Sequence, residues 1–174
     1  MNALLEPWDA EFGLPPFAAI SDADFAPAFD AALTQARANI AAIVEQSEVT
    51  FANTIEAMEL AEGLLDRVAG VFYNLAGADS TPAREALQRD LAPKMSAFAS
   101  EVTNNKALFA RIQKLWTAKD GLDLTPEQLR VLDLYHQMFV RSGAQLEGAG
   151  ADRLTEVKST LAVFGTTFSQ NLLA

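Results

Sequence analysis

Apolar residues recur at steps of three and four along most of the chain, a spacing that predicts amphipathic helices. Good capping residues mark several helix starts: Ser21 precedes the first apolar stripe, and Thr81-Pro82 and Thr125-Pro126 precede two later ones. No segment shows the alternation of a β-strand. We therefore predict an all-α fold of about six amphipathic helices in an antiparallel, bundle-like array. The expected helices span residues 21–45, 53–76, 82–103, 106–119, 126–141 and 151–174.

The first twenty residues differ from the rest of the chain because they combine three prolines with three bulky aromatic residues. Proline lacks the backbone N–H and resists helix interiors. We therefore expect residues 1–20 to form an extended arm whose aromatic side chains hold it against the helices, and residues 21–174 to form the helical domain. The residues concerned are Pro7, Pro15 and Pro16, with Trp8, Phe12 and Phe17.

The last apolar stripe continues to the end of the sequence, where no glycine, asparagine or proline stops the helix. We therefore expect the chain to be a piece of a longer protein. If the stripe packs on the preceding helices, truncating Phe164 should destabilise the fold. If it stays uncovered, it should support a weak homodimer. The stripe consists of Leu154, Val157, Leu161, Phe164, Phe168 and Leu172.

Composition and charge limit the cellular compartment and the binding partners that we expect. Half of the residues are hydrophobic, and no run of 18 apolar residues predicts a membrane span. The absence of cysteine rules out a disulfide framework and fits a reducing compartment, so we expect a cytoplasmic protein. The formal net charge of −10 disfavours nucleic acid and anionic membrane surfaces as partners.

Candidate catalytic and metal-binding residues are few. The chain has one histidine, His136, no cysteine, and no HExxH motif. Catalytic zinc needs three protein ligands and an open position, so we assign no metal ligand and no catalytic residue here. A packed or hydrogen-bonded helix residue is the favoured interpretation of His136. Phosphate-binding glycine motifs are also missing, and Ser142-Gly143 is interpreted as a loop rather than an oxyanion hole.

The remaining candidates are interpreted as structural. Paired carboxylates occur at spacings that any acidic helix produces, and we assign them to solvated helix faces. The internal methionines are expected to fill the core. The carboxylate pairs are Asp22 with Asp24 and Glu59 with Glu62, and the methionines are Met58, Met95 and Met138.

Several short segments, in order along the whole chain, resemble the thimet-oligopeptidase family of zinc metallopeptidases, and most closely its bacterial peptidyl-dipeptidases and oligopeptidase A. None is decisive alone, but their order and spacing agree with the family. The segments are Gly13-Leu14-Pro15-Pro16-Phe17, Phe25-Ala26-Pro27-Ala28-Phe29, Phe51-Ala52-Asn53-Thr54-Ile55, Leu64-Leu65-Asp66-Arg67-Val68, Leu108-Phe109-Ala110-Arg111-Ile112, Phe139-Val140-Arg141-Ser142-Gly143-Ala144, and the stretch from Leu161 to Leu173.

The resemblance implies a role for the chain rather than a set of catalytic residues. In that family an HExxH helix and a downstream glutamate bind zinc, with the motif glutamate as general base, and these residues lie far toward the C-terminus. The present chain resembles the non-catalytic N-terminal helical region, which faces the catalytic domain across a channel that admits short peptides. It would be scaffold and channel wall, with zinc only in the parent protein.

Two questions stay open from the sequence. The parent could remove dipeptides from C-termini or cleave peptides internally. The chain could instead be a stand-alone helical interaction module that binds a partner helix in a hydrophobic groove. An HExxH motif several hundred residues further on would separate these alternatives.

Overall fold

The computed structural model describes residues 2–154, 156–157, 160–161 and 164, and these residues form helices and turns without any strand. The all-α prediction is therefore confirmed. The α-helices are α1 (Asp22–Glu45), α2 (Ala57–Ala61), α3 (Gly63–Ala78), α4 (Pro82–Thr103), α5 (Lys106–Ala118) and α6 (Pro126–Ser142). A π-helical turn, η3 (Ala52–Glu56), leads into α2, and short 3-10 turns are η1 (Glu11–Gly13), η2 (Phe17–Ala19) and η4 (Lys119–Gly121).

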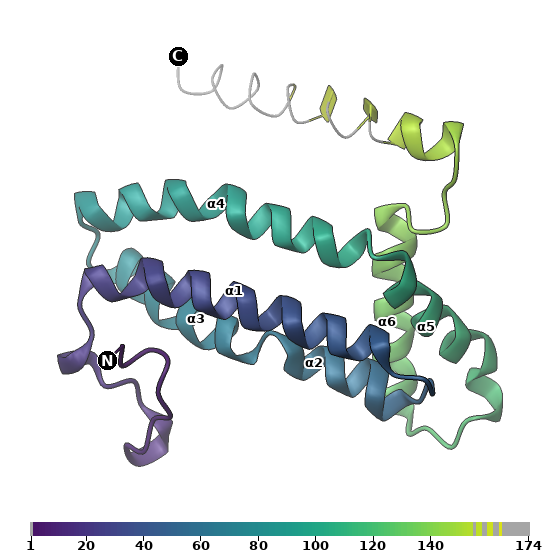
Figure 1. Cartoon of the computed structure of the whole chain (residues 1–174), viewed down its shortest axis with the longest axis horizontal. Coiled ribbons are helices and arrows are strands. Elements are labelled where there is room, and N and C mark those ends of the chain that lie inside the picture. The colour runs from purple at the N-terminus through teal and green to yellow at the C-terminus, as the bar shows by residue number, and fades with distance from the viewer. Residues whose placement is uncertain (1, 155, 158–159, 162–163, 165–174) are drawn as a thin grey trace.

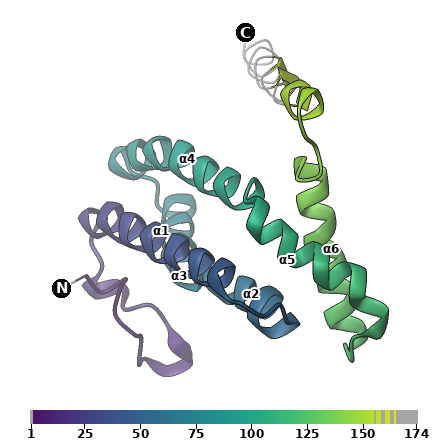
Figure 2. The ribbon, with the colours of Figure 1, turned by 45° about the vertical axis from the view of Figure 1, so that its right-hand side comes forward.

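The helices form an antiparallel array with a hairpin at one end (Figure 1). α3 runs back along α1, and α4 then follows the direction of α1 on its other side. α5 and α6 pack against each other at the end of α1 that carries Glu45, as the rotated view also shows (Figure 2). Residues 2–20 lie at the opposite end of the molecule.

Helix starts follow the capping residues that the sequence marks. At α1 the hydroxyl and the backbone N–H of Ser21 both donate to the Asp24 carboxylate, and at α6 Thr125 and Gln128 form a reciprocal capping box. The hydroxyl of Thr81 accepts a hydrogen bond from the backbone of α4. These local bonds satisfy N–H groups that have no partner inside the helix, so the starts can be predicted from sequence.

The expected continuous helix over residues 53–76 is interrupted, which is a correction. A π-helical turn occupies its start, and the backbone leaves helical geometry at Glu62, with φ −102° and ψ 6°. The helix also continues to Ala78, two residues past the expected end at residue 76. Residues on both sides of the break still face the core, because Met58 and Leu65 are both buried. An unbroken apolar pattern therefore hides the change of helix geometry.

Three phenylalanines form the centre of the core between α1 and α3. Phe72 makes edge-to-face contacts with Phe25 at 5.1 Å and with Phe29 at 5.5 Å between ring centroids. All three side chains are fully buried. Such contacts add to the hydrophobic stabilisation of these large side chains.

The apolar stripe near the C-terminus does not reach this core. Leu161 and Phe164 are 62% and 64% exposed, and Val157 is also exposed, so of the two alternatives the sequence left open these three follow the uncovered one. Phe168 and Leu172 lie outside the described residues. The reason is that α5 and α6 already close the core: Leu108, Leu132 and Phe139 are fully buried without the stripe.

We predict opposite sensitivities for two phenylalanines. Phe72→Ala should lower the free energy of unfolding by roughly 3–5 kcal/mol, because it removes a fully buried ring. Phe164→Ala should change it by less than about 0.5 kcal/mol, because that ring is mostly exposed. Urea unfolding of both variants and the wild type measures this. Equal losses would show that the two rings are equally buried in solution.

Candidate functional site

His136 is enclosed by side chains of α5 rather than presented in a cleft. Its ring stacks on Trp116 with centroids 4.1 Å apart and planes 8° from parallel. Its Nε2 lies 2.9 Å from Oε1 of Gln113, within hydrogen-bond distance. Burial lowers the pKa of His136, while nearby Asp133 opposes this effect. The interpretation as a packed, hydrogen-bonded helix histidine is confirmed.

Asp133 links this cluster to two further side chains. One carboxylate oxygen accepts hydrogen bonds from Trp116 Nε1 at 2.8 Å and from Lys119 Nζ at 2.9 Å. The bond from Lys119, and secondarily that from Trp116, lowers the pKa of Asp133. A carboxylate held in this way orients the indole and the ammonium group and is not a free base.

The two carboxylates at the start of α1 stay partly accessible to solvent, and both also have structural partners. Asp22 pairs with Arg84 of α4 at 2.8 Å. Asp24 accepts bonds from the hydroxyl and the backbone N–H of Ser21, and these bonds lower its pKa. The sequence did not reveal the pair between Asp22 and Arg84 because the two residues are 62 positions apart.

The second carboxylate pair lies beside α6. Glu59 is exposed but shares a hydrogen bond with Tyr135, and burial followed by this bond raises the pKa of Tyr135 above its usual range. Glu62 is half-buried, and burial with the nearby charge of Asp66 raises its pKa. Only Glu59 therefore matches the expected solvated face, and it too has a partner.

The methionines and the glycine loop complete the sequence candidates. Met58 is buried and Met95 packs against the core, whereas Met138 is 40% exposed and is not part of the core, so the core assignment is wrong for Met138. Ser142 ends α6, and Gly143 follows with φ 98°, the left-handed cap that glycine favours. Ser142-Gly143 therefore forms the end of α6, which agrees with its interpretation as the start of a loop.

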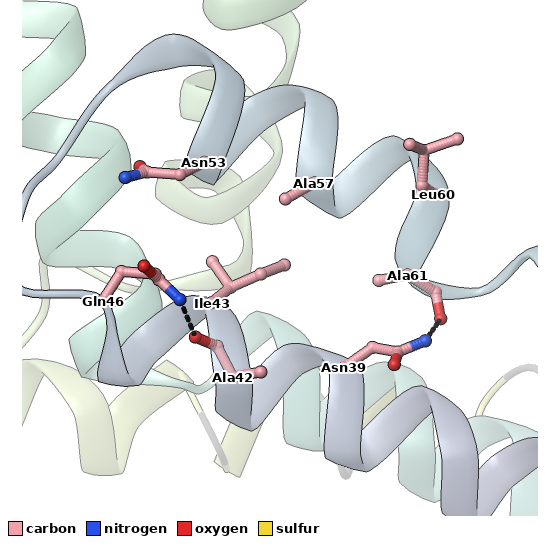
Figure 3. A pocket seen from close by; sticks show the side chains of 8 residues that line it. All are labelled: Asn39, Ala42, Ile43, Gln46, Asn53, Ala57, Leu60 and Ala61. Carbon is pink, nitrogen blue, oxygen red and sulfur yellow. Dashed lines mark hydrogen bonds between the residues drawn. The ribbon is translucent and has the colours of Figure 1, made fainter.

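A groove of about 500 Å³ lies between the C-terminal half of α1 and the η3–α2 segment (Figure 3). Its walls are mainly alanine, isoleucine and leucine, and none of its lining residues is titratable. The amides at its edge already have partners: Asn39 donates to the Ala61 carbonyl at 2.8 Å and Gln46 to that of Ala42 at 3.4 Å. The groove can hold an apolar group but offers no nucleophile or general base. The lining residues are Asn39, Ala42, Ile43, Gln46, Asn53, Ala57, Leu60 and Ala61.

One buried arginine fixes the loop that joins the two walls of this groove. The guanidinium of Arg111 donates to the carbonyls of Gln46 and Glu48, each at 2.6 Å, and to Oδ1 of Asn53 at 3.0 Å. Its Nε is buried without a partner. Asn53 in turn donates to the Glu48 carbonyl at 3.2 Å. Sequence reasoning missed this clamp, although Arg111 falls within the apolar stripe of its helix.

The residues present do not fit a zinc site. His136 has its Nε2 hydrogen-bonded to Gln113 and its ring stacked on Trp116, and no cluster of three histidine or carboxylate ligands occurs in the described part of the chain. The geometry therefore assigns no metal-dependent step to these residues.

The environment of His136 generates a pH prediction. Because burial lowers its folded pKa below the ordinary value of about 6.5, folding favours the neutral ring. The stability it contributes is complete above about pH 6.5 and is lost as the pH falls through the folded pKa. Wild type should therefore lose more stability between pH 7.5 and 5.5 than His136→Phe, which keeps a stacked ring. Parallel pH curves from denaturant unfolding would contradict this.

The Arg111 clamp generates a stability prediction. Arg111→Met should cost at least about 2 kcal/mol, because it leaves carbonyl groups without their donor. Arg111→Lys should rescue only part of this loss, because an ammonium group cannot match the planar fork. Lys114→Met on the exposed side of α5 is the control. The prediction fails if thermal unfolding shows the same midpoint for both methionine variants.

Comparison with known proteins identifies relatives over nearly the full chain. No family model matches it. The chain is 34% identical to a dipeptidyl carboxypeptidase of Salmonella typhimurium and 33% identical to one of Escherichia coli, over 99% and 100% of its length. It is 26% identical to oligopeptidase A of Salmonella typhimurium over 98% of its length.

These matches cover 26%, 26% and 25% of the respective relatives, so the chain spans about a quarter of their length. The relatives carry the names that the sequence motifs lead one to expect. The chain is therefore related to the thimet-oligopeptidase family, as the resemblance of its sequence predicts.

Proposed function

We propose that this chain is the non-catalytic, N-terminal helical segment of a zinc-dependent oligopeptidase or peptidyl-dipeptidase that cleaves short peptides. It forms scaffold and channel wall opposite the catalytic domain. The observation that carries the proposal is the match of almost the whole chain to one quarter of two dipeptidyl carboxypeptidases. Its partners are then the catalytic domain of the same protein and, in the channel, short peptides.

The chemistry of the side chains supports a structural role. His136 is packed, Asp22 and Asp24 are used in an ion pair and a helix cap, and the groove beside α1 has no titratable lining. The capped helices and the buried Arg111 clamp provide a firm wall instead.

The reacting groups belong to the remainder of such a protein. A zinc ion there would polarise the peptide carbonyl and activate water, held by an HExxH motif and a downstream glutamate. The segment described here would orient peptide substrates and exclude larger ones, because helices beside a channel limit which peptides reach the metal. Whether the parent removes C-terminal dipeptides or cuts internally depends on that remainder.

Charge and hydropathy set the expected surroundings. The net charge of −10 disfavours nucleic acid and anionic membranes as partners. Among the described residues, no helix is both long and apolar enough to cross a bilayer. The lack of cysteine agrees with a cytoplasmic, reducing location for the parent.

A second candidate function rests on the exposed stripe. Val157, Leu161 and Phe164 offer an apolar surface without a covering element among the described residues. A stand-alone interaction module would use such a surface to bind a partner helix. This candidate differs from the first because it requires no catalytic activity from any larger chain.

The decisive experiment is a chimera in which this chain replaces the matching quarter of the Escherichia coli dipeptidyl carboxypeptidase. The chimera should hydrolyse a short fluorogenic peptide, with sensitivity to a zinc chelator and kcat/KM within about 100-fold of the intact enzyme, a loss of less than about 3 kcal/mol. The isolated 174-residue chain should be inactive and should hold no stoichiometric zinc after dialysis.

Two controls make the result interpretable. The same enzyme without its N-terminal quarter should be inactive, which shows that the grafted segment is needed. Circular dichroism and a cooperative melting transition must show that the chimera folds. A folded chimera without peptide hydrolysis contradicts the proposed function and favours the interaction module.

A further inference from the structure

The base of the N-terminal arm is fixed to the helices. Leu4 is fully buried, and Asn2 donates from Nδ2 to the Asp24 carbonyl at 2.7 Å. Arg67 of α3 donates to the Leu4 carbonyl at 3.0 Å and lies 5.0 Å from the centre of the Trp8 ring. The arm is therefore positioned by specific contacts, and its tip projects from a rigid base.

The tip of the arm has the opposite character, because its apolar side chains face solvent. Phe12 is 89% exposed, Leu14 is 55% exposed and Phe17 is 49% exposed. A cluster of three such side chains on one short segment is typical of a contact surface.

The backbone at the tip is also unfavourable for the residue it carries. Phe12 has φ 60° and ψ 16°, in the left-handed region, and it is the one non-glycine residue with positive φ in the described part of the chain. Bulky side chains rarely adopt this conformation without a stabilising contact. In this conformation the Phe12 ring stays in solvent. Packing on the arm itself would have buried the ring instead.

The groove beside Phe12 has a volume of about 250 Å³ and belongs to the arm itself. Trp8 and Leu14 are among its lining residues, whereas Phe12 is not. The arm thus offers a projecting ring and, next to it, a mainly apolar hollow that Glu6 and Asp9 also line. A complementary surface would need a pocket for the ring and an apolar ridge for the hollow.

Charge indicates the nature of that surface. The charged residues of the arm are all acidic, namely Glu6, Asp9 and Glu11, and the first basic residue of the whole chain is Arg37. None of the three forms an ion pair with another described residue. A second copy would bring like charges together, which disfavours pairing between two arms. A surface with lysine or arginine around an apolar pocket is complementary instead.

We propose that the arm tip, residues 9–17, docks on the part of the peptidase outside these 174 residues. Phe12 enters an apolar pocket rimmed by lysine or arginine there. This inference rests on the proposed function, since it assumes a longer peptidase chain. Relatives about four times as long as this chain leave three quarters of their length to supply such a surface. Docking would brace the helical wall against the catalytic domain.

Limited proteolysis tests the docking directly. Chymotrypsin cleaves after exposed aromatic residues, so the isolated chain should be cut rapidly after Phe12. In the Escherichia coli chimera the same bond should be cut at least about tenfold more slowly, because cleavage then requires undocking. N-terminal sequencing of the products identifies the bond, and the rates are compared at equal protease concentration.

Variants separate the contribution of the Phe12 ring to docking from that of the carboxylates. Phe12→Ala in the chimera should restore fast cleavage after Phe17, and Asp9→Asn with Glu11→Gln should reduce protection and remove its dependence on salt. Leu134→Ala changes an exposed apolar residue on α6, far from the arm in sequence, and should leave protection unchanged. Phe12→Gly should raise the melting temperature of the isolated chain by a small amount, because glycine accepts positive φ, and should lower protection in the chimera.

The outcomes distinguish this inference from the function on which it rests. An active chimera whose Phe12 bond is cut as fast as in the isolated chain overturns docking and leaves the proposed function standing. An inactive but folded chimera overturns the proposed function. Concentration-dependent dimers of the isolated chain that disappear in Phe12→Gly would show that a second copy is the partner, which also overturns the inference.

Discussion

The buried guanidinium of Arg111 ties α5 to the connection between α1 and η3, and so joins the α5–α6 hairpin to the long helices. Its acceptors are the carbonyls of Gln46 and Glu48 and the side chain of Asn53, without any carboxylate. Burying a cation is costly unless hydrogen bonds compensate, and these bonds compensate only if the loop keeps one conformation. The clamp therefore fixes the loop, the π-helical turn that follows it, and the groove between α1 and α2.

Helix starts and buried faces could be predicted from the sequence, because both depend on neighbours within one or two turns. Ser21 and Thr125 cap helices through bonds to residues three positions away, and Phe72 follows the same apolar period as Leu65. The break at Glu62 could not be predicted, because the apolar pattern continues across it. The exposure of Phe164 was equally hidden: an amphipathic stripe requires a partner surface but does not say which chain supplies it.

In the candidate site, too, features set by neighbours along the helix could be predicted, whereas contacts with distant helices could not. His136 lies on an apolar stripe, and its packed state follows from that position. The partners of Asp22 and Glu59 come from distant helices, so spacing alone did not reveal the ion pair of Asp22 or the hydrogen bond between Glu59 and Tyr135. Arg111 carried a usable signal, since a charge between Leu108 and Ile112 on the buried face must have internal partners.

Several basic side chains form bonds within the chain, and this affects which molecules the surface of the segment can bind. Arg84 and Lys119 pair with carboxylates within the chain, and Lys106 donates to the carbonyls of Ala144 and Leu146. With 13 basic and 23 acidic residues, the charge that remains outward is mainly negative. Solvent screens such charge beyond about 8 Å, so it selects a partner only at contact. The tip of the arm carries both groups that such a contact needs, an apolar ring to bury and carboxylates to pair. Arg67 holds the base of the arm in place through its contacts with Leu4 and Trp8.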